Sequence, residues 1–508
     1  MRYLLFLLIF LLLTKLKSLD ISTVPFCERP LNFDGPDFIR VYEFEELHQL
    51  KLEEPNLQMF VRNMNDLTEL NLDNVDLSAQ GSNRSKTLAN ALPRLQSLSL
   101  SFCRLSGSIH PSFSQLQSLS HIDLEGNDLS SEAPHFFANF SNLVTLSLRS
   151  CDLQGNFPEN VLILPKLQSI DLSDNSLLTG HLPKFPFNSS LRQLKLYNTN
   201  FRGKLPDSIG NLMFLTHLLL SSSNFIGSIP SLLANLTLIV ELDLRGNSFS
   251  GSIPPFHASA VPNLEFLRLS SNLLNGVIYS SLFTLPSLQG LCLDNNHFSG
   301  QLEEFSNASS SDGPIPKSIS KLPRLVYLEL AANNFYGTMK LDIFQSLRNL
   351  NSLDLSDNKL SIEGDNGSFT LPNLAALKLS RCNLTEVPKF LKNQVGLKTL
   401  NLSNNQIHGS VPSWIWNSGS LYELDLSQNA VDFLEQPLLA DSNQSKTVID
   451  GGKNPSSSIL GVLALRSCNL SRFPDFLKNQ DILFYIDLSD NKINGRTPSW
   501  IWKKNLRI

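Results

Sequence analysis

Residues 215–254 read LTHLLLSSSNFIGSIPSLLANLTL and then IVELDLRGNSFSGSIP, which are two consecutive copies of one template. The template is L-xx-L-x-L-xx-N-x-L-x-G-x-I-P, and its copies are filled by Leu215, Leu218, Leu220, Phe225, Gly227, Ile229 and Pro230, then by Ile239, Leu242, Leu244, Asn247, Phe249, Gly251, Ile253 and Pro254. The L-x-L part alternates like a short strand with one buried face. Because one turn cannot form a core alone, the period predicts stacked turns whose strands pair into a parallel sheet.

The remaining template positions have physical roles of their own. The Asn slot directs an amide inward, where it satisfies backbone groups of the bend that follows the strand. Gly opens the next bend, where a side chain would hinder the chain, and Pro ends the second extended segment. The pattern therefore predicts an α/β leucine-rich-repeat solenoid: a curved right-handed superhelix with a parallel β-sheet on its concave face and mostly loop or 3-10 helix on its convex side.

The repeats cover residues 47–434, with a period of about 24 residues from Leu95 onward. The first template match is Leu47-His-Gln-Leu50-Lys-Leu52, with Pro55 in the Asn slot. An irregular break at 303–324 and a polar stretch at 435–459, either an insertion or a degraded repeat, interrupt the series. The final repeats, 460–508, end without a capping sequence, although a solenoid end needs a polar cover.

The N-terminus has the pattern of a secretory signal peptide over residues 1–18. Arg2 precedes an apolar run at 4–13, which is too short for a membrane helix, and no later run is long enough to span a bilayer. Residues 19–46 fit no repeat and are expected to form a degenerate N-terminal cap. We expect the chain to enter the secretory pathway and to act outside the cell or at its surface.

Glycosylation is expected in a secreted chain that is rich in N-x-S/T sequons. The candidate positions are Asn83, Asn139, Asn188, Asn235, Asn307, Asn366, Asn383, Asn401, Asn443 and Asn469. Asn401 also faces the predicted concave sheet, so a glycan there would block that face locally.

The cysteines are interpreted as structural rather than cross-linked. Two of those in the Asn slot, Cys103 and Cys151, are two turns and so about 10 Å apart. This exceeds the limit of about 7 Å between the Cα atoms of a disulfide. We expect buried thiols at Cys103, Cys151, Cys382 and Cys468, whereas Cys27 and Cys292 have no evident partner.

The composition and motifs favour a protein without enzymatic activity. The charge is slightly acidic, with 46 Asp+Glu against 41 Lys+Arg, and no basic run suggests nucleic acid. No phosphate loop, nucleophile elbow or metal-spaced Cys/His cluster is present, so neither a cofactor nor a metal is expected. The acids that recur in the L-D-L slot are interpreted as part of the repeat consensus: Asp171, Asp243, Asp354, Asp425 and Asp487.

Recognition is therefore expected on the concave face, where the residues beside the strand leucines point. Many of these positions follow a common D-L-S pattern, and the departures from it cluster between residues 193 and 329. Aromatic and arginine side chains are typical binding anchors. The candidate ligand-binding residues are Lys195, Tyr197, His217, Arg245, Phe266, Arg268, Asp294, Tyr327 and Glu329, with Leu219 and Cys292 beside them.

The sequence resembles the plant-specific leucine-rich repeat through its G-x-I-P tails, such as GKLP at 203–206 and GSIP at 227–230. Longer stretches are similar to the Verticillium-wilt resistance class of plant receptor-like proteins. They are LKLEEPNLQMFVRNMNDLTELNLDNVDLSAQG (50–81), FANFSNLVTLSLRSCDLQGNFPE (137–159), LPKFPFNSSLRQLKL (182–196) and VPSWIW (411–416).

The resemblance implies a cell-surface immune receptor with a leucine-rich ectodomain, one membrane helix and a short tail without kinase, in the plasma membrane. Such receptors perceive extracellular microbial proteins or peptides and signal through partner kinases, including leucine-rich-repeat co-receptor kinases. The family's paired-cysteine cap and membrane helix are missing from this sequence, so the chain looks like a truncated member. Two other interpretations stay open: a secreted leucine-rich-repeat inhibitor of microbial wall-degrading enzymes, and a soluble decoy or non-functional fragment.

Overall fold

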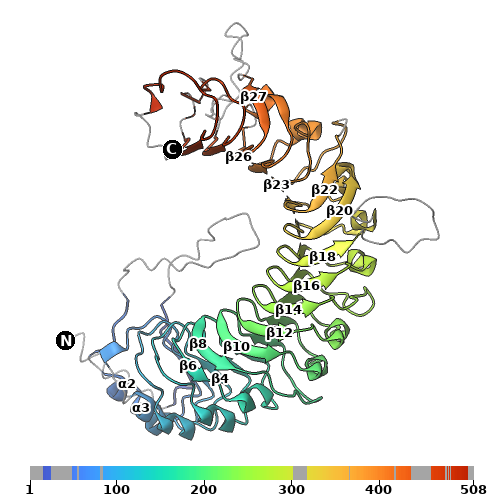
Figure 1. Ribbon diagram of the computed structural model, residues 1–508. Helices are drawn as coiled ribbons and strands as arrows, with labels where there is room; N and C mark the ends of the chain where they lie inside the picture. Colours follow the sequence, from blue (N-terminus) through green and yellow to red (C-terminus); the bar gives the residue numbers. More distant parts are fainter. Residues whose placement is uncertain are drawn as a thin grey trace, which may run out of the picture. The chain divides into compact units, whose positions relative to one another are not determined.

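The computed structural model describes residues 15–23, 49–53, 56–79, 84–300, 317–364, 367–416, 419–435, 459–474, 477–478, 480 and 482–501 (Figure 1). Its contacts divide the chain into two units, of which the first holds the described residues up to Leu273 and the second those from Leu274 onward. The apolar run at 4–13 and most of the two irregular stretches, at 301–316 and 436–458, lie outside the described residues.

Short parallel strands form the main sheet of each unit. In the first unit they pair in chain order: β1 (Ser18–Asp20), β2 (Glu69–Asn71), β3 (Ser97–Ser99), β4 (His121–Asp123), β5 (Thr145–Ser147), β7 (Ser169–Asp171), β9 (Gln193–Lys195), β11 (His217–Leu219), β13 (Glu241–Asp243) and β15 (Phe266–Arg268). In the second unit the order is β17 (Gly290–Cys292), β19 (Tyr327–Glu329), β21 (Ser352–Asp354), β23 (Ala376–Lys378), β24 (Thr399–Asn401), β26 (Glu423–Asp425), β28 (Val462–Ala464) and β29 (Tyr485–Asp487). The predicted stacking of parallel strands is confirmed.

A second set of parallel strands follows the Asn slot and was not predicted as a sheet. The first unit contains β6 (Gln154–Asn156), β8 (Asn175–Gly180), β10 (Thr199–Lys204), β12 (Asn224–Gly227) and β14 (Ser248–Gly251). The second contains β18 (His297–Gly300), β20 (Asn334–Met339) and β22 (Lys359–Ile362), and a separate pair, β25 (His408–Val411) and β27 (Ala430–Leu434). The strand β16 (Leu273–Gly276), which pairs with β18, begins at the last residue of the first unit.

Short helices complete most turns, as predicted. Among the described residues, two are α-helices, α2 (Leu57–Val61) and α3 (Arg84–Ala91). The 3-10 helices are η2 (Pro111–Gln115), η3 (His135–Asn139), η4 (Glu159–Ile163), η5 (Asp207–Asn211), η6 (Ser231–Asn235), η7 (Ser280–Thr284), η8 (Lys317–Lys321), η9 (Leu341–Phe344), η10 (Lys389–Asn393) and η11 (Ser413–Ile415). Template prolines such as Pro206 and Pro230 stand at the N-cap, where their fixed φ suits the entry to the helix.

The prediction that the segment Leu47–Leu52 supplies the first strand of the main sheet is wrong. Ser18–Asp20 pairs with β2, whereas Lys51 forms only an isolated bridge to Asp76, beyond the main-sheet strand of that turn. The reason lies in the spacing, because Leu16, Leu19 and Ile21 repeat the L-xx-L-x-L pattern and fill the place beside β2. The predicted cap at 19–46 lies largely outside the described residues, and the predicted signal segment stays a prediction.

The bends use the Asn slot as predicted. Asn175 is 1% exposed; its Oδ1 accepts from the amides of Cys151 (3.1 Å) and Leu153 (2.9 Å) in the preceding turn. Its Nδ2 donates to the carbonyls of Leu148 (2.9 Å), Leu172 (2.8 Å) and Ser173 (3.1 Å). One side chain therefore satisfies backbone groups of two successive turns, which would otherwise be buried without partners.

The cysteines in this slot are buried free thiols, which confirms their structural interpretation. The Cys151 thiol donates to the carbonyls of Leu124 (3.1 Å) and Arg149 (3.4 Å), as an Asn amide does elsewhere, and burial raises its pKa to about 12. Ser150 and Asp152, which flank it, both have left-handed backbones, whereas around Asn175 only the preceding Asp174 does. The backbone around Cys151 therefore differs from that around Asn175 by one further left-handed residue.

Candidate functional site

The candidate residues lie in rows that cross the parallel strands. In the first unit, four neighbouring strands, β9, β11, β13 and β15, each have a central leucine. The residues that precede these leucines are register partners and form one row: Gln193, His217, Glu241 and Phe266. The residues that follow the leucines form the next row: Lys195, Leu219, Asp243 and Arg268. The central leucines themselves are buried, so each row presents its side chains to one face of the sheet.

The two candidate arginines are held by neighbouring carboxylates. Arg245 follows the last strand leucine of its turn and so lies beside the rows, where it makes a bidentate contact with Asp243, at 3.1 and 3.0 Å. Arg268 pairs with Glu241 and lies 4.6 Å from the centre of the Phe266 ring. The charges are therefore fixed before any ligand binds, and a ligand would have to compete with these pairs.

Lys195 and His217 are more loosely held. The Lys195 ammonium lies 3.7 Å from Asp171, and the His217 ring nitrogen lies 2.9 Å from the Thr216 hydroxyl. Burial lowers the pKa of His217, so this imidazole favours its neutral form. Both side chains are half-buried and remain accessible from the face of the sheet.

A cluster centred on Arg149 was missed by the sequence analysis. Its guanidinium lies 2.9 Å from Asp174 and 3.5 Å from Glu125, and 5.6 Å from the centre of the Tyr197 ring. Burial raises the pKa of Glu125 to about 7 and raises that of Tyr197 as well. Tyr197 is the only member of this cluster that the sequence analysis named as a candidate. Its ring lies beside the ion pairs of Arg149.

A sequence signal for this cluster does exist. Glu125 and Arg149 follow the last strand leucine, at the template position that Tyr197 and Arg245 occupy and that Ser173 fills in the intervening turn. They lie outside the range 193–329 to which the prediction was confined. Ser173 is buried, and its hydroxyl has no partner among the described residues.

In the second unit Glu329 is the most deeply placed candidate. It is 6% exposed, and its carboxylate accepts a hydrogen bond of 2.8 Å from the Ser352 hydroxyl. Asp354 is its register partner on the next strand, and Lys378 lies 3.6 Å from Asp354. Burial raises the pKa of Glu329 to about 7, and the pKa of Asp354 is raised too. The half-buried Tyr327 and Asp294 are the more accessible candidates here.

The Glu329→Gln variant is expected to stabilise the protein above pH 7 and to leave its stability unchanged near pH 4. A carboxyl group in an unfolded chain has a pKa near 4.3, so the folded protein holds this proton more tightly. The contribution of this pKa difference to the free energy of unfolding is fully present below about pH 4 and is lost as the pH rises through about 7. We expect a gain on the order of 2 kcal/mol at pH 8, measured by urea unfolding.

The control for this experiment is Glu363→Gln, which changes an exposed glutamate of the same unit. A Glu329→Gln effect that is equal at pH 4 and pH 8 would contradict the assigned cause.

The acids of the L-D-L slot serve the repeat itself. The Oδ1 atom of each accepts a hydrogen bond from the backbone N–H two residues later, which caps the turn that follows the strand. The donors to Asp171, Asp243, Asp354, Asp425 and Asp487 are Ser173, Arg245, Ser356, Ser427 and Ser489. This geometry supports the interpretation of these acids as consensus residues.

Six candidate glycosylation positions lie in the described part of the chain: Asn139, Asn188, Asn235, Asn383, Asn401 and Asn469. The other four, Asn83, Asn307, Asn366 and Asn443, lie outside it. Asn401 is half-buried on β24, and its Oδ1 accepts from the Ser403 amide (2.9 Å) and hydroxyl (2.7 Å). These bonds orient the Asn401 amide and leave its Nδ2 atom, to which a glycan would be attached, outside them.

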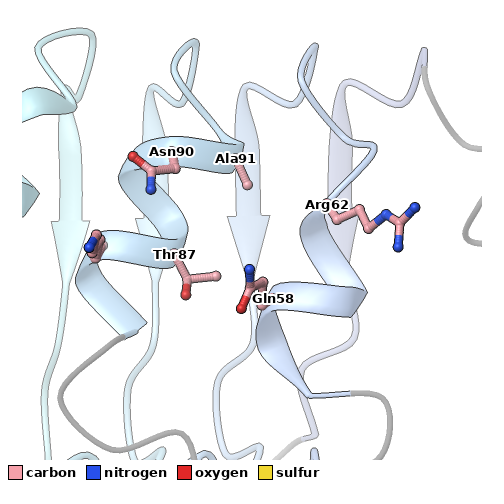
Figure 2. A pocket seen from close by; sticks show the side chains of 6 residues that line it. Gln58, Arg62, Thr87, Asn90 and Ala91 are labelled. Atoms are coloured by element: carbon pink, nitrogen blue, oxygen red, sulfur yellow. The ribbon is translucent and has the colours of Figure 1, made fainter.

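A polar pocket of about 420 Å³ lies between α2 and α3, away from the candidate rows (Figure 2). Figure 2 shows Thr87 of α3 and Gln58 of α2 lying toward one another, while Arg62 extends away from them. Its lining is Gln58, Arg62, Lys86, Thr87, Asn90 and Ala91. None of the nine concave candidates contributes to it.

Two further observations concern only the described residues. The described residues include no group of three or more His, Cys, Asp or Glu side chains placed to hold a metal ion. None of the helices among them is both long enough and apolar enough to cross a membrane.

Comparison with known proteins agrees with the geometry of the turns. Profiles described as "Leucine rich repeat" match residues 93–153, 323–384 and 372–431, and also 166–188, 190–212 and 239–259. These are leucine-rich repeats. The solenoid is similar to the plant peptide hormone receptor RGFR1 in complex with RGF2, with 28% identity, a TM-score of 0.67 and coverage of 84% of this chain and 64% of that one.

Other plant proteins are similar to this chain. The Arabidopsis receptor kinase HAESA, in complex with the peptide hormone IDA and the co-receptor SERK1, has 26% identity and a TM-score of 0.66, with coverage of 89% of this chain and 74% of that one. Receptor-like protein 54 of Arabidopsis thaliana is 33% identical over 247 residues, or 45% of this chain and 31% of that protein. Receptor like protein 22 of the same plant is 37% identical over 144 residues, or 28% and 17%. The chain therefore matches less than a third of the length of these curated relatives.

Proposed function

We propose that the repeats form the extracellular ligand-recognition part of a plant cell-surface receptor-like protein of the Verticillium-wilt resistance class, acting in immunity. The observation that carries this proposal is the set of half-buried aromatic and charged side chains on the strand rows. Phe266 in the first unit and Tyr327 in the second stand where the repeat commonly carries small polar residues. Such side chains supply binding energy in protein interfaces.

The partner classes follow from the relatives. Because HAESA is known in complex with a peptide hormone and a co-receptor, we propose an extracellular microbial protein or peptide as the ligand and a leucine-rich-repeat co-receptor kinase as the signalling partner. The ligand would contact the rows of each unit, with the Arg149 cluster in the first and the surroundings of Glu329 in the second. The proposed location is the plasma membrane surface, facing outward, and the proposed role involves no enzymatic step.

A receptor chimera tests this function. The full chain, fused to a single membrane-spanning helix and a short cytoplasmic tail, is expressed in leaves that are then treated with culture filtrates of plant-pathogenic fungi, and the oxidative burst is measured. We expect Phe266→Ala, and separately Tyr327→Ala, to raise the filtrate concentration needed for a half-maximal burst by about tenfold or more, since removing an aromatic anchor costs about 1.4 kcal/mol or more.

The matched controls are Tyr279→Ala and Tyr336→Ala, which remove exposed tyrosines at the start of η7 and on β20. They should leave the response unchanged. If no filtrate from a broad panel produces a burst, or if the control variants lose the response as fully as the row variants, the proposal is overturned.

A further inference from the structure

Three successive turns of the first unit expose large apolar side chains outside the strand rows. Phe187 is 86% exposed, and Met213 and Phe214 are about half exposed, at 49% and 48%. Leu232 and Leu238 are also exposed, at 42% and 38%. We call these five residues the apolar strip. Soluble proteins seldom leave such groups together in water unless something covers them.

The turns that carry the strip are in direct contact. The Ser208 hydroxyl accepts from the Phe185 amide at 2.9 Å, and the Asn211 side chain donates to the Phe185 carbonyl at 2.9 Å. On the other side η5 packs against η6, where Leu232 lies so close to Gly210 that a methyl group there would overlap its Cβ. The strip therefore crosses neighbouring turns of one packed surface.

Two sequons lie within the strip. Asn188 directly follows Phe187, and Asn235 stands three residues from both Leu232 and Leu238. Both asparagines are exposed, as is Thr237, the hydroxyl residue of the second sequon. Asn139 provides a contrast, because it ends η3 as Asn235 ends η6 and is exposed, but the positions equivalent to Leu232 and Leu238 are Phe136 and Asn142, which are both half-buried.

We propose that N-linked glycans on Asn188 and Asn235 cover the apolar strip. The modification transfers an oligosaccharide from a lipid-linked diphosphate donor to the asparagine Nδ2. The bond from sugar C1 to the phosphate oxygen breaks, a C1–Nδ2 bond forms, one amide proton is lost, and the lipid diphosphate leaves. The carbon-bound hydrogens of the first sugars pack on Phe187 and Leu238, while their hydroxyls face water. The inference rests on the proposed function, because only a secreted chain meets this donor.

The test expresses the full chain in a plant secretory system and measures the occupancy of each sequon by peptide mass spectrometry. Occupancy of Asn188 and Asn235 is expected. The double variant Ser190→Ala/Thr237→Ala, which keeps both asparagines, is expected to lose these glycans, to bind more of a hydrophobic dye and to shift toward dimers in sedimentation. Ser190→Thr/Thr237→Ser preserves both sequons and should behave like the unchanged protein.

Ser141→Ala, which removes only the Asn139 sequon, should change neither dye binding nor sedimentation. Enzymatic deglycosylation of the unchanged, folded protein should reproduce the double variant, so the test does not depend on folding of a mutant. Occupancy of Asn139 with either Asn188 or Asn235 empty would overturn the inference while leaving the proposed function standing. So would loss of both glycans without a rise in dye binding. A chain with no glycan at any sequon would overturn the inference and the proposed extracellular role together.

Discussion

Replacing Asn175 with leucine is expected to lower the free energy of unfolding by about 3–5 kcal/mol, because each buried polar group left without a partner costs about 1–3 kcal/mol. The amides of Cys151 and Leu153 would lose their acceptor, and three carbonyls would lose a donor. Leucine has the same number and branching of side-chain heavy atoms and is not smaller, so the loss arises from hydrogen bonds rather than from a cavity. Urea unfolding followed by circular dichroism measures the change.

The control for this variant occupies the same slot one turn later. The Thr199 hydroxyl donates to the Leu196 carbonyl at 2.7 Å, whereas the Asn175 amide donates to three carbonyls. Thr199→Val removes that hydroxyl at constant shape and should cost only about 1 kcal/mol. Equal losses for the two variants would show that the number of backbone groups hydrogen-bonded by the side chain in this slot does not determine its contribution to the free energy of unfolding.

The period of the sequence was sufficient to predict the main sheet, because each strand leucine has one way to be buried. Leu218, Leu242 and Leu267 are register partners and are fully or almost fully buried. The roles of the slot residues followed equally well, since an inward amide or thiol in a bend has only backbone groups to bind. The left-handed φ of Gly227, 83°, fits its place in the second bend.

The end of the array was harder to predict, because two segments matched the template and only one place was available. The segments around Leu19 and Leu50 carry the same spacing, and spacing alone does not decide which of them pairs with β2. The second sheet was missed for a different reason. Its strands, such as β12, lie in the second extended segment of the template, but their pairing depends on the neighbouring turn and has no signal within one repeat.

The positions of the candidate residues along the turns were predictable, but their charged neighbours were not. The template spacing placed Arg268 on a strand row and Tyr197 directly after the last strand leucine, yet the charged groups beside them come from other turns. Arg149 reaches back to Glu125 and forward to Asp174, which are 24 and 25 residues distant in sequence. Which carboxylate a long side chain chooses depends on rotamers and burial, and these are set by packing rather than by the template.

The second large effect is expected for Phe249→Ala, at about 3–5 kcal/mol of unfolding free energy. Phe249 is fully buried, and its ring stacks on that of Phe225 with centroids 6.2 Å apart and planes at 6°. Alanine would open a cavity between two turns whose strands, β12 and β14, pair directly. Because a solenoid is stabilised by contacts between neighbours, the loss should be felt at the interfaces on both sides of this turn.

The matched control for this core position is Phe249→Leu, because the next turn already has a leucine there. The Phe249 amide donates to Asn272 as the Leu274 amide donates to Asn296, so the two positions are equivalent. Leucine should therefore cost about 1 kcal/mol and keep the stack of turns intact. Native-state hydrogen exchange would locate the effect: in the alanine variant, amides of β12 and β14 should lose protection before those of β2 and β3. Uniform loss across the first unit would mean that its turns unfold as one block and that neighbour contacts do not divide its stability.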